Sequence, residues 1–256
     1  MKRLKEFAYH EPATVDEAGA ILDAGGEGTR VLAGGTDLIV DLKIERLPTV
    51  AVVNIKRIPG LSGINDLGDG TRIGALTKVT DIEVSSLVKE RHSALVEAAS
   101  ILASPPVRAL ATIGGNVGRA SPASDRGPAL IVSGAMARIR GVTGEREELV
   151  EDLYVGPGPT SLAVSDLITD FIIPIPPIGF GSAHVKLGKR GSGTDIAMAG
   201  ASAGVVINGG LIADCKIALA SLGPSPFRAT SAETKLRGVP PTEEFLAAAA
   251  DAAARE

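Results

Sequence analysis

Two short segments of the chain have the residue types that can hold an anionic ligand. They read Val-Leu-Ala-Gly-Gly-Thr-Asp-Leu at 31–38 and Thr-Ile-Gly-Gly-Asn at 112–116. A glycine pair lets the backbone adopt positive φ and approach a ligand closely, and successive backbone N–H groups can then converge on a phosphate. One such segment could be a simple tight turn. Two in one chain predict two contacts with one extended ligand, such as the pyrophosphate of a dinucleotide.

Familiar phosphate-binding and metal-binding patterns do not explain these segments. The chain has neither the G-x-G-x-x-G fingerprint nor the G-x-x-x-x-G-K-[ST] loop. Its single cysteine, Cys215, excludes an internal disulfide and a cysteine cluster, and its three histidines are too widely spaced for a metal-ligand motif. No constellation of acid–base residues is evident. We therefore expect no catalytic group and no metal site in this chain.

Length and charge narrow the class of protein. The chain has 256 residues, which is enough for a substantial core and more than one domain. Its formal net charge of −4 argues against nucleic acid, whose binding proteins usually present a basic face. The first residues are charged and lack the apolar core of a signal peptide, and no apolar run reaches the length of a membrane span. These features predict a cytoplasmic protein.

The first third of the chain is expected to alternate strands and helices. Thr14 and Glu17 form a capping box for a helix that ends at Gly25 and Gly26. Strands are expected at 6–10, 29–33 and 49–55, with a short helix from Thr36 to Lys43. The first glycine segment therefore follows the second of these strands directly.

The remaining elements fall on either side of a proline-rich linker, Pro174 to Gly179. Before the linker we expect strands at 71–76 and 166–173 and a hairpin of 136–142 with 145–150. We also expect one helix from Thr80 or Asp81 to Arg91 and a second at 93–104 that ends at Pro105. A further helix should follow the second glycine segment and run up to Gly134. After the linker we expect a strand at 182–190, a hairpin around Asn208, Gly209 and Gly210, and a helix at 242–256.

Together these residues resemble a known family. The segments 31–38 and 112–116, with Ala-Ser-Pro-Ala-Ser-Asp at 120–125, resemble the FAD-binding medium subunit of molybdenum hydroxylases. That family includes bacterial xanthine dehydrogenases, aerobic carbon monoxide dehydrogenase and 4-hydroxybenzoyl-CoA reductase. Further matches lie at 73–75, 106–108, 185–187, 190 and 217–230. The resemblance covers nearly the whole chain in the family's order and spacing.

The resemblance implies an α+β fold with a two-lobed FAD-binding domain of the PCMH (vanillyl-alcohol-oxidase-like) type. Residues 1–55 and 56–177 would form the two lobes, with FAD in the cleft between them. Residues 180–256 would form a small C-terminal antiparallel sheet-and-helix domain. Because the chain stops at Glu256, where relatives usually continue, the resemblance implies a shortened C-terminal domain.

The resemblance also implies a function in electron transfer. A large subunit with molybdopterin would oxidise the substrate, and a small iron–sulfur subunit with [2Fe–2S] clusters would relay the electrons. FAD on this chain would then pass them to an external acceptor, NAD or another carrier. The sequence of this chain does not identify the substrate, because the substrate would bind a different polypeptide. Two alternatives stay open: a stand-alone FAD-dependent oxidoreductase with a similar cradle, and a scaffold subunit that has lost FAD.

The resemblance assigns cofactor contacts residue by residue. The residues that it implies are Val31, Leu32, Ala33, Gly34, Gly35, Thr36, Asp37, Leu38, Leu102, Thr112, Ile113, Gly114, Gly115, Asn116, Asp125, Ile168 and Lys186. Asp125 would accept hydrogen bonds from FAD, and Lys186 would lie near the flavin and tune its reduction. Asp125 could instead cap the helix that follows it, Lys186 could be a solvated strand residue, and Leu102 and Ile168 could belong to the core. The role of His184 stays open.

Overall fold

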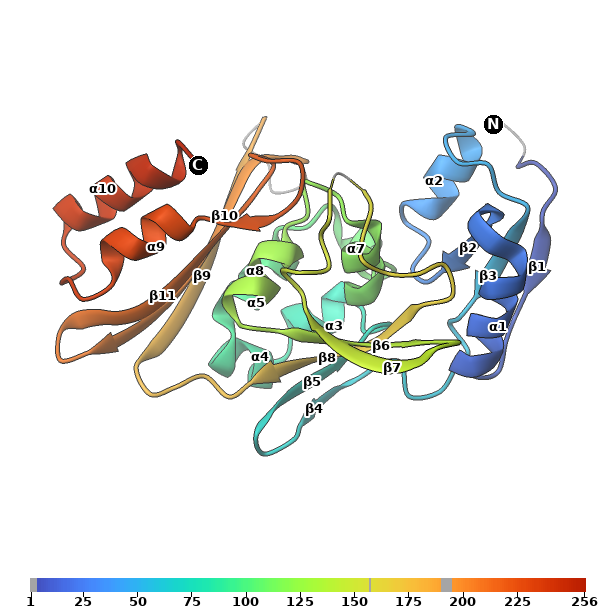
Figure 1. Cartoon of the computed structure of the whole chain (residues 1–256), viewed down its shortest axis with the longest axis horizontal. Helices are drawn as coiled ribbons and strands as arrows, with labels where there is room; N and C mark the ends of the chain where they lie inside the picture. The colour runs from blue at the N-terminus through green and yellow to red at the C-terminus, as the bar shows by residue number, and fades with distance from the viewer. Residues whose placement is uncertain (1–3, 157, 190–194) are drawn as a thin grey trace.

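A computed structural model describes residues 4–156, 158–189 and 195–256 of the chain. Its strands form three separate sheets that follow one another along the chain. Figure 1 shows the N-terminal lobe in blue at one end, the middle lobe in cyan to yellow, and the C-terminal sheet and helices in orange and red at the other end. The sheets lie within 8–54, 64–174 and 180–228, inside the three units expected from the sequence. The unit boundaries themselves stay a prediction.

The N-terminal lobe is a small parallel sheet covered by one amphipathic helix. Its elements are β1 (Ala8–His10), α1 (Val15–Gly25), a 3-10 turn (Gly26–Gly28), β2 (Thr29–Leu32), α2 (Leu38–Lys43) and β3 (Ala51–Asn54). The sheet order is β1-β3-β2, with β3 pairing in parallel with both neighbours. One half of the capping box is confirmed, because Thr14 Oγ1 accepts from the N–H of Glu17 at 3.1 Å. Glu17 in turn accepts from the N–H of Ala13, one residue before the cap, at 2.8 Å.

The middle lobe is an antiparallel sheet with helices packed on one face. Its strands are β4 (Ile64–Asp66), β5 (Gly70–Gly74), β6 (Met136–Gly141), β7 (Gly144–Leu149) and β8 (Leu167–Pro174), in the order β4-β5-β8-β6-β7. Its helices are α3 (Val79–Glu83), α4 (Ser86–Arg91), α5 (Ser93–Ser100), α6 (Pro105–Arg108), α7 (Ile113–Arg119) and α8 (Arg126–Val132). The main core lies between helices and sheet, where Leu95 and Leu130 pack with Ile139 and Phe171.

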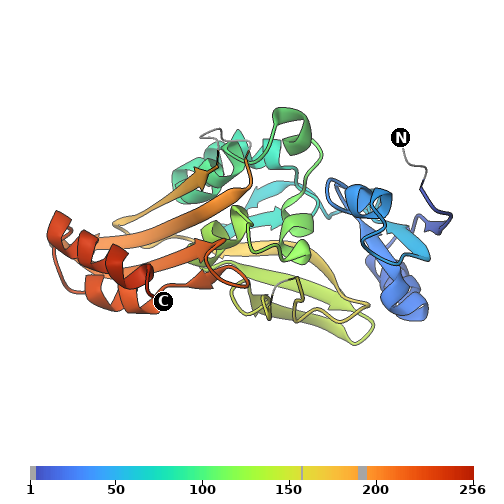
Figure 2. The same ribbon diagram turned by 90° about the horizontal axis from the view of Figure 1, so that it is seen from above.

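The C-terminal sheet lies against the far side of the same helices. Its strands β9 (Phe180–Gly188), β10 (Ala197–Asn208), β11 (Leu211–Ala220) and β12 (Phe227–Arg228) pair in the order β12-β11-β10-β9. Helices α5 and α8 contact strands of this sheet, and Ala218 of β11 joins the middle core. The last helices, α9 (Thr230–Leu236) and α10 (Glu243–Ala253), cover its other face (Figure 2). The helix predicted at 242–256 and the hairpin at 208–210 are confirmed.

Two helix predictions for the middle lobe were wrong in their bounds. One helix up to Arg91 was expected, but Ser85 accepts from the N–H of Val88 at 3.3 Å and starts a new helix. The helix expected at 93–104 ends at Ser100. Pro105 and Pro106 do not merely stop it: they occupy the first turn of α6, where a missing N–H has no cost.

Two further corrections concern the glycine segments. Thr36 does not cap α2, which starts at Leu38 without a side-chain cap. The second segment is not a loop followed by one helix up to Gly134. It forms the first turn of α7, capped by Thr112, and the left-handed residue Ala120, with φ of 48°, separates α7 from α8. The strand predicted at 182–190 is β9, although residue 190 itself lies outside the described residues.

Candidate functional site

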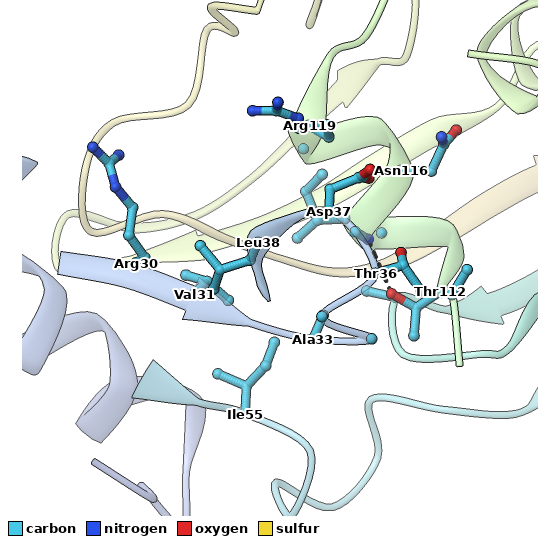
Figure 3. A pocket seen from close by; sticks show the side chains of 18 of the residues that line it. Arg30, Val31, Ala33, Thr36, Asp37, Leu38, Ile55, Thr112, Asn116 and Arg119 are labelled. Atoms are coloured by element: carbon cyan, nitrogen blue, oxygen red, sulfur yellow. Dashed lines mark hydrogen bonds between the residues drawn. The ribbon is translucent and has the colours of Figure 1, made fainter. Parts of the chain in front are cut away.

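A cavity of about 530 Å³ lies between the N-terminal and middle lobes. Both glycine segments reach it, so residues far apart in the sequence share one wall (Figure 3). The sequence-predicted residues that line it are Val31, Ala33, Gly34, Gly35, Thr36, Asp37, Leu38, Thr112, Gly114, Gly115, Asn116 and Ile168. This volume is in the range of pockets for small molecules and cofactors.

The first glycine segment presents free backbone donors to the cavity. Gly35 has φ of 77°, a conformation that favours glycine. Within the described residues, the N–H groups of 34–37 have no acceptor from the protein. Unpaired main-chain donors beside a cavity are suited to an anionic group. The first glycine segment therefore has the unpaired backbone N–H groups that its sequence predicts.

The second glycine segment differs from the prediction, because its N–H groups at 113–116 are not free to bind an anion. The N–H groups of 113–116 all have partners within the protein: Ile113 donates to Thr77 at 3.1 Å, Gly114 to Ala75 at 2.8 Å, and Gly115 and Asn116 to Thr112 at 3.2 and 3.1 Å. The glycines are required by close packing rather than by positive φ, because a Cβ at Gly114 would lie 2.6 Å from that of Ala75. Residues 113–116 therefore offer the cavity a surface and side chains, not main-chain donors.

Five of the sequence-predicted residues lie outside the cavity wall: Leu32, Leu102, Ile113, Asp125 and Lys186. Leu32 and Ile113 are buried in the cores behind the two glycine segments, and Leu102 packs against the middle core. Leu102 is therefore packed as a core residue, which was the alternative to a flavin contact. Ile168 is also buried in that core, yet it reaches the cavity.

Asp125 and Lys186 form a buried ion pair between α8 and β9. Lys186 Nζ lies 3.1 Å from Asp125 Oδ2 and donates to the carbonyl of Ile101 at 2.9 Å. Both side chains are buried, so a solvated Lys186 is wrong. Asp125 occupies the N-cap position of α8 without a side-chain capping bond, so the capping alternative is wrong too. Burial raises the pKa of Asp125, and the Lys186 charge opposes that rise.

Arginines at the cavity were missed by the sequence reasoning as ligand contacts. Arg30, Arg119 and Arg126 all line it. Arg119 Nη2 lies 2.9 Å from Asp41 Oδ2, an ion pair that joins α7 to α2 across the two lobes. Figure 3 shows Arg30 and Arg119 on different sides of the cavity. These three arginines reach the same cavity only in the folded chain. No sequence pattern in 29–38 or 112–126 predicts that they do.

His184 is a structural residue in this fold. Its Nδ1 lies 2.8 Å from Ser202 Oγ, its backbone N–H donates to Glu97, and the side chain is buried. Burial, with the Lys186 charge, lowers the pKa of His184 to about 4, so it is neutral at pH 7. Ser202 has the spacing Gly-x-Ser-x-Gly, but it lies inside strand β10 and is 1% exposed. A buried serine in a straight strand lacks the strand–turn–helix exposure of a nucleophile.

The described residues hold no cluster of three His, Cys, Asp or Glu side chains placed to bind a metal ion. Among the helices that the structure describes, none combines the length and the hydrophobicity needed to cross a bilayer.

Fold and cavity together define a flavoprotein subunit, and comparisons with known proteins agree. Residues 5–176 match the family model described as "FAD binding domain in molybdopterin dehydrogenase", and residues 183–256 match "CO dehydrogenase flavoprotein C-terminal domain". The carbon monoxide dehydrogenase medium chain of Hydrogenophaga pseudoflava is 34% identical over 96% of this chain and 85% of its own. The xanthine dehydrogenase FAD-binding subunit of Escherichia coli O157:H7 is 31% identical over 92% and 81%.

Solved structures show the same relationship in three dimensions. The carbon monoxide dehydrogenase of Hydrogenophaga pseudoflava superposes with a TM-score of 0.94 at 34% identity, covering 98% of this chain and 86% of that one. The chain belongs to the family of FAD-binding medium subunits of molybdenum hydroxylases, and its cofactor is FAD. The expected FAD-binding domain with a C-terminal antiparallel sheet-and-helix domain is confirmed.

Proposed function

We propose that this chain is the FAD-carrying electron-transfer subunit of a multi-subunit molybdenum hydroxylase. The observation that carries the proposal is the cavity between the lobes, which is lined by residues 34–37, whose N–H groups have no acceptor within the described residues, and by residues of the middle lobe. When bound there, FAD supplies the redox chemistry. The chain's own residues bind and orient the cofactor, and the proposed contacts remain those at 31–38, 102, 112–116, 125, 168 and 186.

The proposed partners follow from the relatives. Carbon monoxide and xanthine dehydrogenases are the named enzymes to which relatives of this chain belong. A large subunit with molybdopterin would oxidise the substrate, and a small subunit with [2Fe–2S] clusters would deliver the electrons to this chain. An external acceptor, NAD or another carrier, would receive them. The three units 1–55, 56–177 and 180–256 and the cytoplasmic location remain part of this proposal.

The test separates the subunit from both alternatives. Purified chain should show a flavin absorption spectrum with one noncovalent FAD, and co-expression with neighbouring subunits should yield a complex with iron and molybdenum. A chain that binds no flavin would be the scaffold alternative. A flavin-loaded chain that oxidises a substrate without iron–sulfur partners would be the stand-alone oxidoreductase.

A prediction follows for Lys186, whose ammonium donates to the carbonyl of Ile101, the residue before the expected flavin contact Leu102. Lys186→Met keeps the apolar stem and removes a positive charge that would stabilise the negative charge gained on reduction. We expect the midpoint potential of the bound flavin to fall by about 30 mV for each ~1.4 kcal/mol of lost stabilisation. Spectroelectrochemical titration of the two proteins measures this directly. An unchanged potential would remove Lys186 from the residues that tune the flavin.

A further inference from the structure

Arg126 is a buried cation at the wall of the cavity. It is the first residue of α8 and is only 2% exposed, yet its side chain lines the cavity. Its Nε and Nη1 atoms have no hydrogen-bond partner. A guanidinium has five N–H donors and no acceptor, and burying such a group without a partner is costly. The buried ammonium of Lys186, in contrast, donates to two acceptors within the protein.

Asp125 and Asp37 act on Arg126 through their charges, but neither forms a hydrogen bond that satisfies its Nε or Nη1. The neighbouring Asp125 is engaged by Lys186 at 3.1 Å. Tyr154 is buried nearby, and burial raises its pKa, so its phenol stays neutral. Burial lowers the pKa of Arg126 to about 10, which still leaves the guanidinium charged at pH 7.

The two lobes would then contribute different kinds of donor. The N-terminal lobe offers the free N–H groups of 34–37, whereas the N–H groups of 113–116 in the middle lobe are all used internally. Any anion contact from the middle lobe must therefore come largely from side chains, and Arg126 is a cavity-lining cation whose Nε and Nη1 have no partner, whereas Arg119 is paired with Asp41. A planar guanidinium matches two oxygens of a phosphate at once.

We propose that Arg126 binds the pyrophosphate of FAD and is the middle lobe's main anion contact. The inference rests on the proposed function, since it needs FAD in the cavity between the lobes. The pyrophosphate would supply the acceptors that the protein does not, so the cofactor would neutralise a charge that destabilises the chain when no anion is bound.

The experiment compares Arg126→Met with the wild-type chain after removal of flavin. Loss of the charged donors should weaken FAD about ten- to a hundredfold. ADP, which keeps the pyrophosphate but lacks the flavin, should weaken by a similar factor, and riboflavin, which has no phosphate, should bind both proteins equally. Isothermal titration with the three compounds measures these ratios. Arg126→Lys keeps the charge without the fork and should fall between the two.

Stability of the flavin-free protein gives an independent readout. Arg126→Met should melt at or above the wild-type temperature, because it removes a buried unpaired charge. The matched control is Arg228→Met, whose guanidinium is paired with Glu233 at 2.5 Å in the C-terminal domain. That variant should melt lower and bind FAD as the wild type does.

Three outcomes would overturn the inference. The first is an unchanged FAD affinity in Arg126→Met. The second is a weaker FAD affinity with an unchanged ADP affinity, which would place the contact at the flavin. The third is a loss of stability of the flavin-free protein as large as that of the Arg228→Met control. If the wild-type chain itself bound no FAD, the proposed function would fail first and this inference with it.

Discussion

Gly35→Val is expected to reduce the FAD affinity at least a hundredfold. The residue has φ of 77°, and a side chain there would lie 3.0 Å from Leu32 Cδ1. Valine is poorly tolerated in the left-handed region, at a cost of roughly 1–2 kcal/mol, so the segment must change its path. The N–H groups of 34–37, which have no acceptor in the protein, would then be displaced from their positions at the cavity. Losing two or three hydrogen bonds to a charged group, at roughly 1.5–3 kcal/mol each, accounts for the expected factor.

Gly26→Val is the matched control for backbone strain. Gly26 has φ of 60°, ends helix α1 away from the cavity, and has nothing within 4 Å of an added Cβ. Both variants should lose thermal stability, but only Gly35→Val should lose flavin. The flavin-to-protein ratio after gel filtration measures retention, and a dissociation constant follows by titration. Equal flavin content in the Gly35 variant and the wild type would contradict the assignment of residues 31–38 as a binding segment for FAD.

Asp125→Ala is expected to lower the free energy of unfolding by about 3–5 kcal/mol, even without FAD. The change leaves the ammonium of Lys186 buried with the carbonyl of Ile101 but without its carboxylate. Removing one member of a buried ion pair has costs of this size. From the sequence alone, Asp125→Ala would be expected to weaken FAD binding with little loss of stability. The buried pair, joined across 61 residues, reverses the second half of that expectation.

Urea unfolding of the flavin-free chain checks the prediction, and two further variants sharpen it. Asp125→Asn keeps an acceptor for Lys186 and should lose less. The double variant Asp125→Ala with Lys186→Met buries no charge at these positions and should recover much of the lost stability. If the double variant were as unstable as the sum of the single ones, the pair would contribute no coupling.

Local patterns were enough to predict most of the fold. The cap of α1 at Thr14, the strands of the N-terminal lobe and the hairpin at 208–210 were each predicted from residues close in sequence, and each is present in the structure. The helices of the middle lobe were harder, because Ser85 and Ala120 divide runs that look continuous by composition. Such breaks depend on single residues that compete with helix periodicity.

The site was predictable in position and less so in chemistry. Both glycine segments do reach one cavity, but only the first has free N–H groups, because 113–116 donate to Thr112, Ala75 and Thr77. Which donors are already used is a property of tertiary contacts. For the same reason the sequence did not point to Arg126, since neither its burial nor its unpaired nitrogens leave a signal in the residues beside it.

The strand order of the middle sheet also sets the order in which the chain can fold. Strands β4 and β5 form one hairpin and β6 and β7 another, and both are joined only through β8. Thr71 pairs with Ile173, a loop closure of about a hundred residues, which is entropically costly and slow. During synthesis each hairpin can pair locally, but the two can join into one sheet only after residues 167–174 have left the ribosome. Until then Ile168 is not in place, and the wall of the cavity is incomplete.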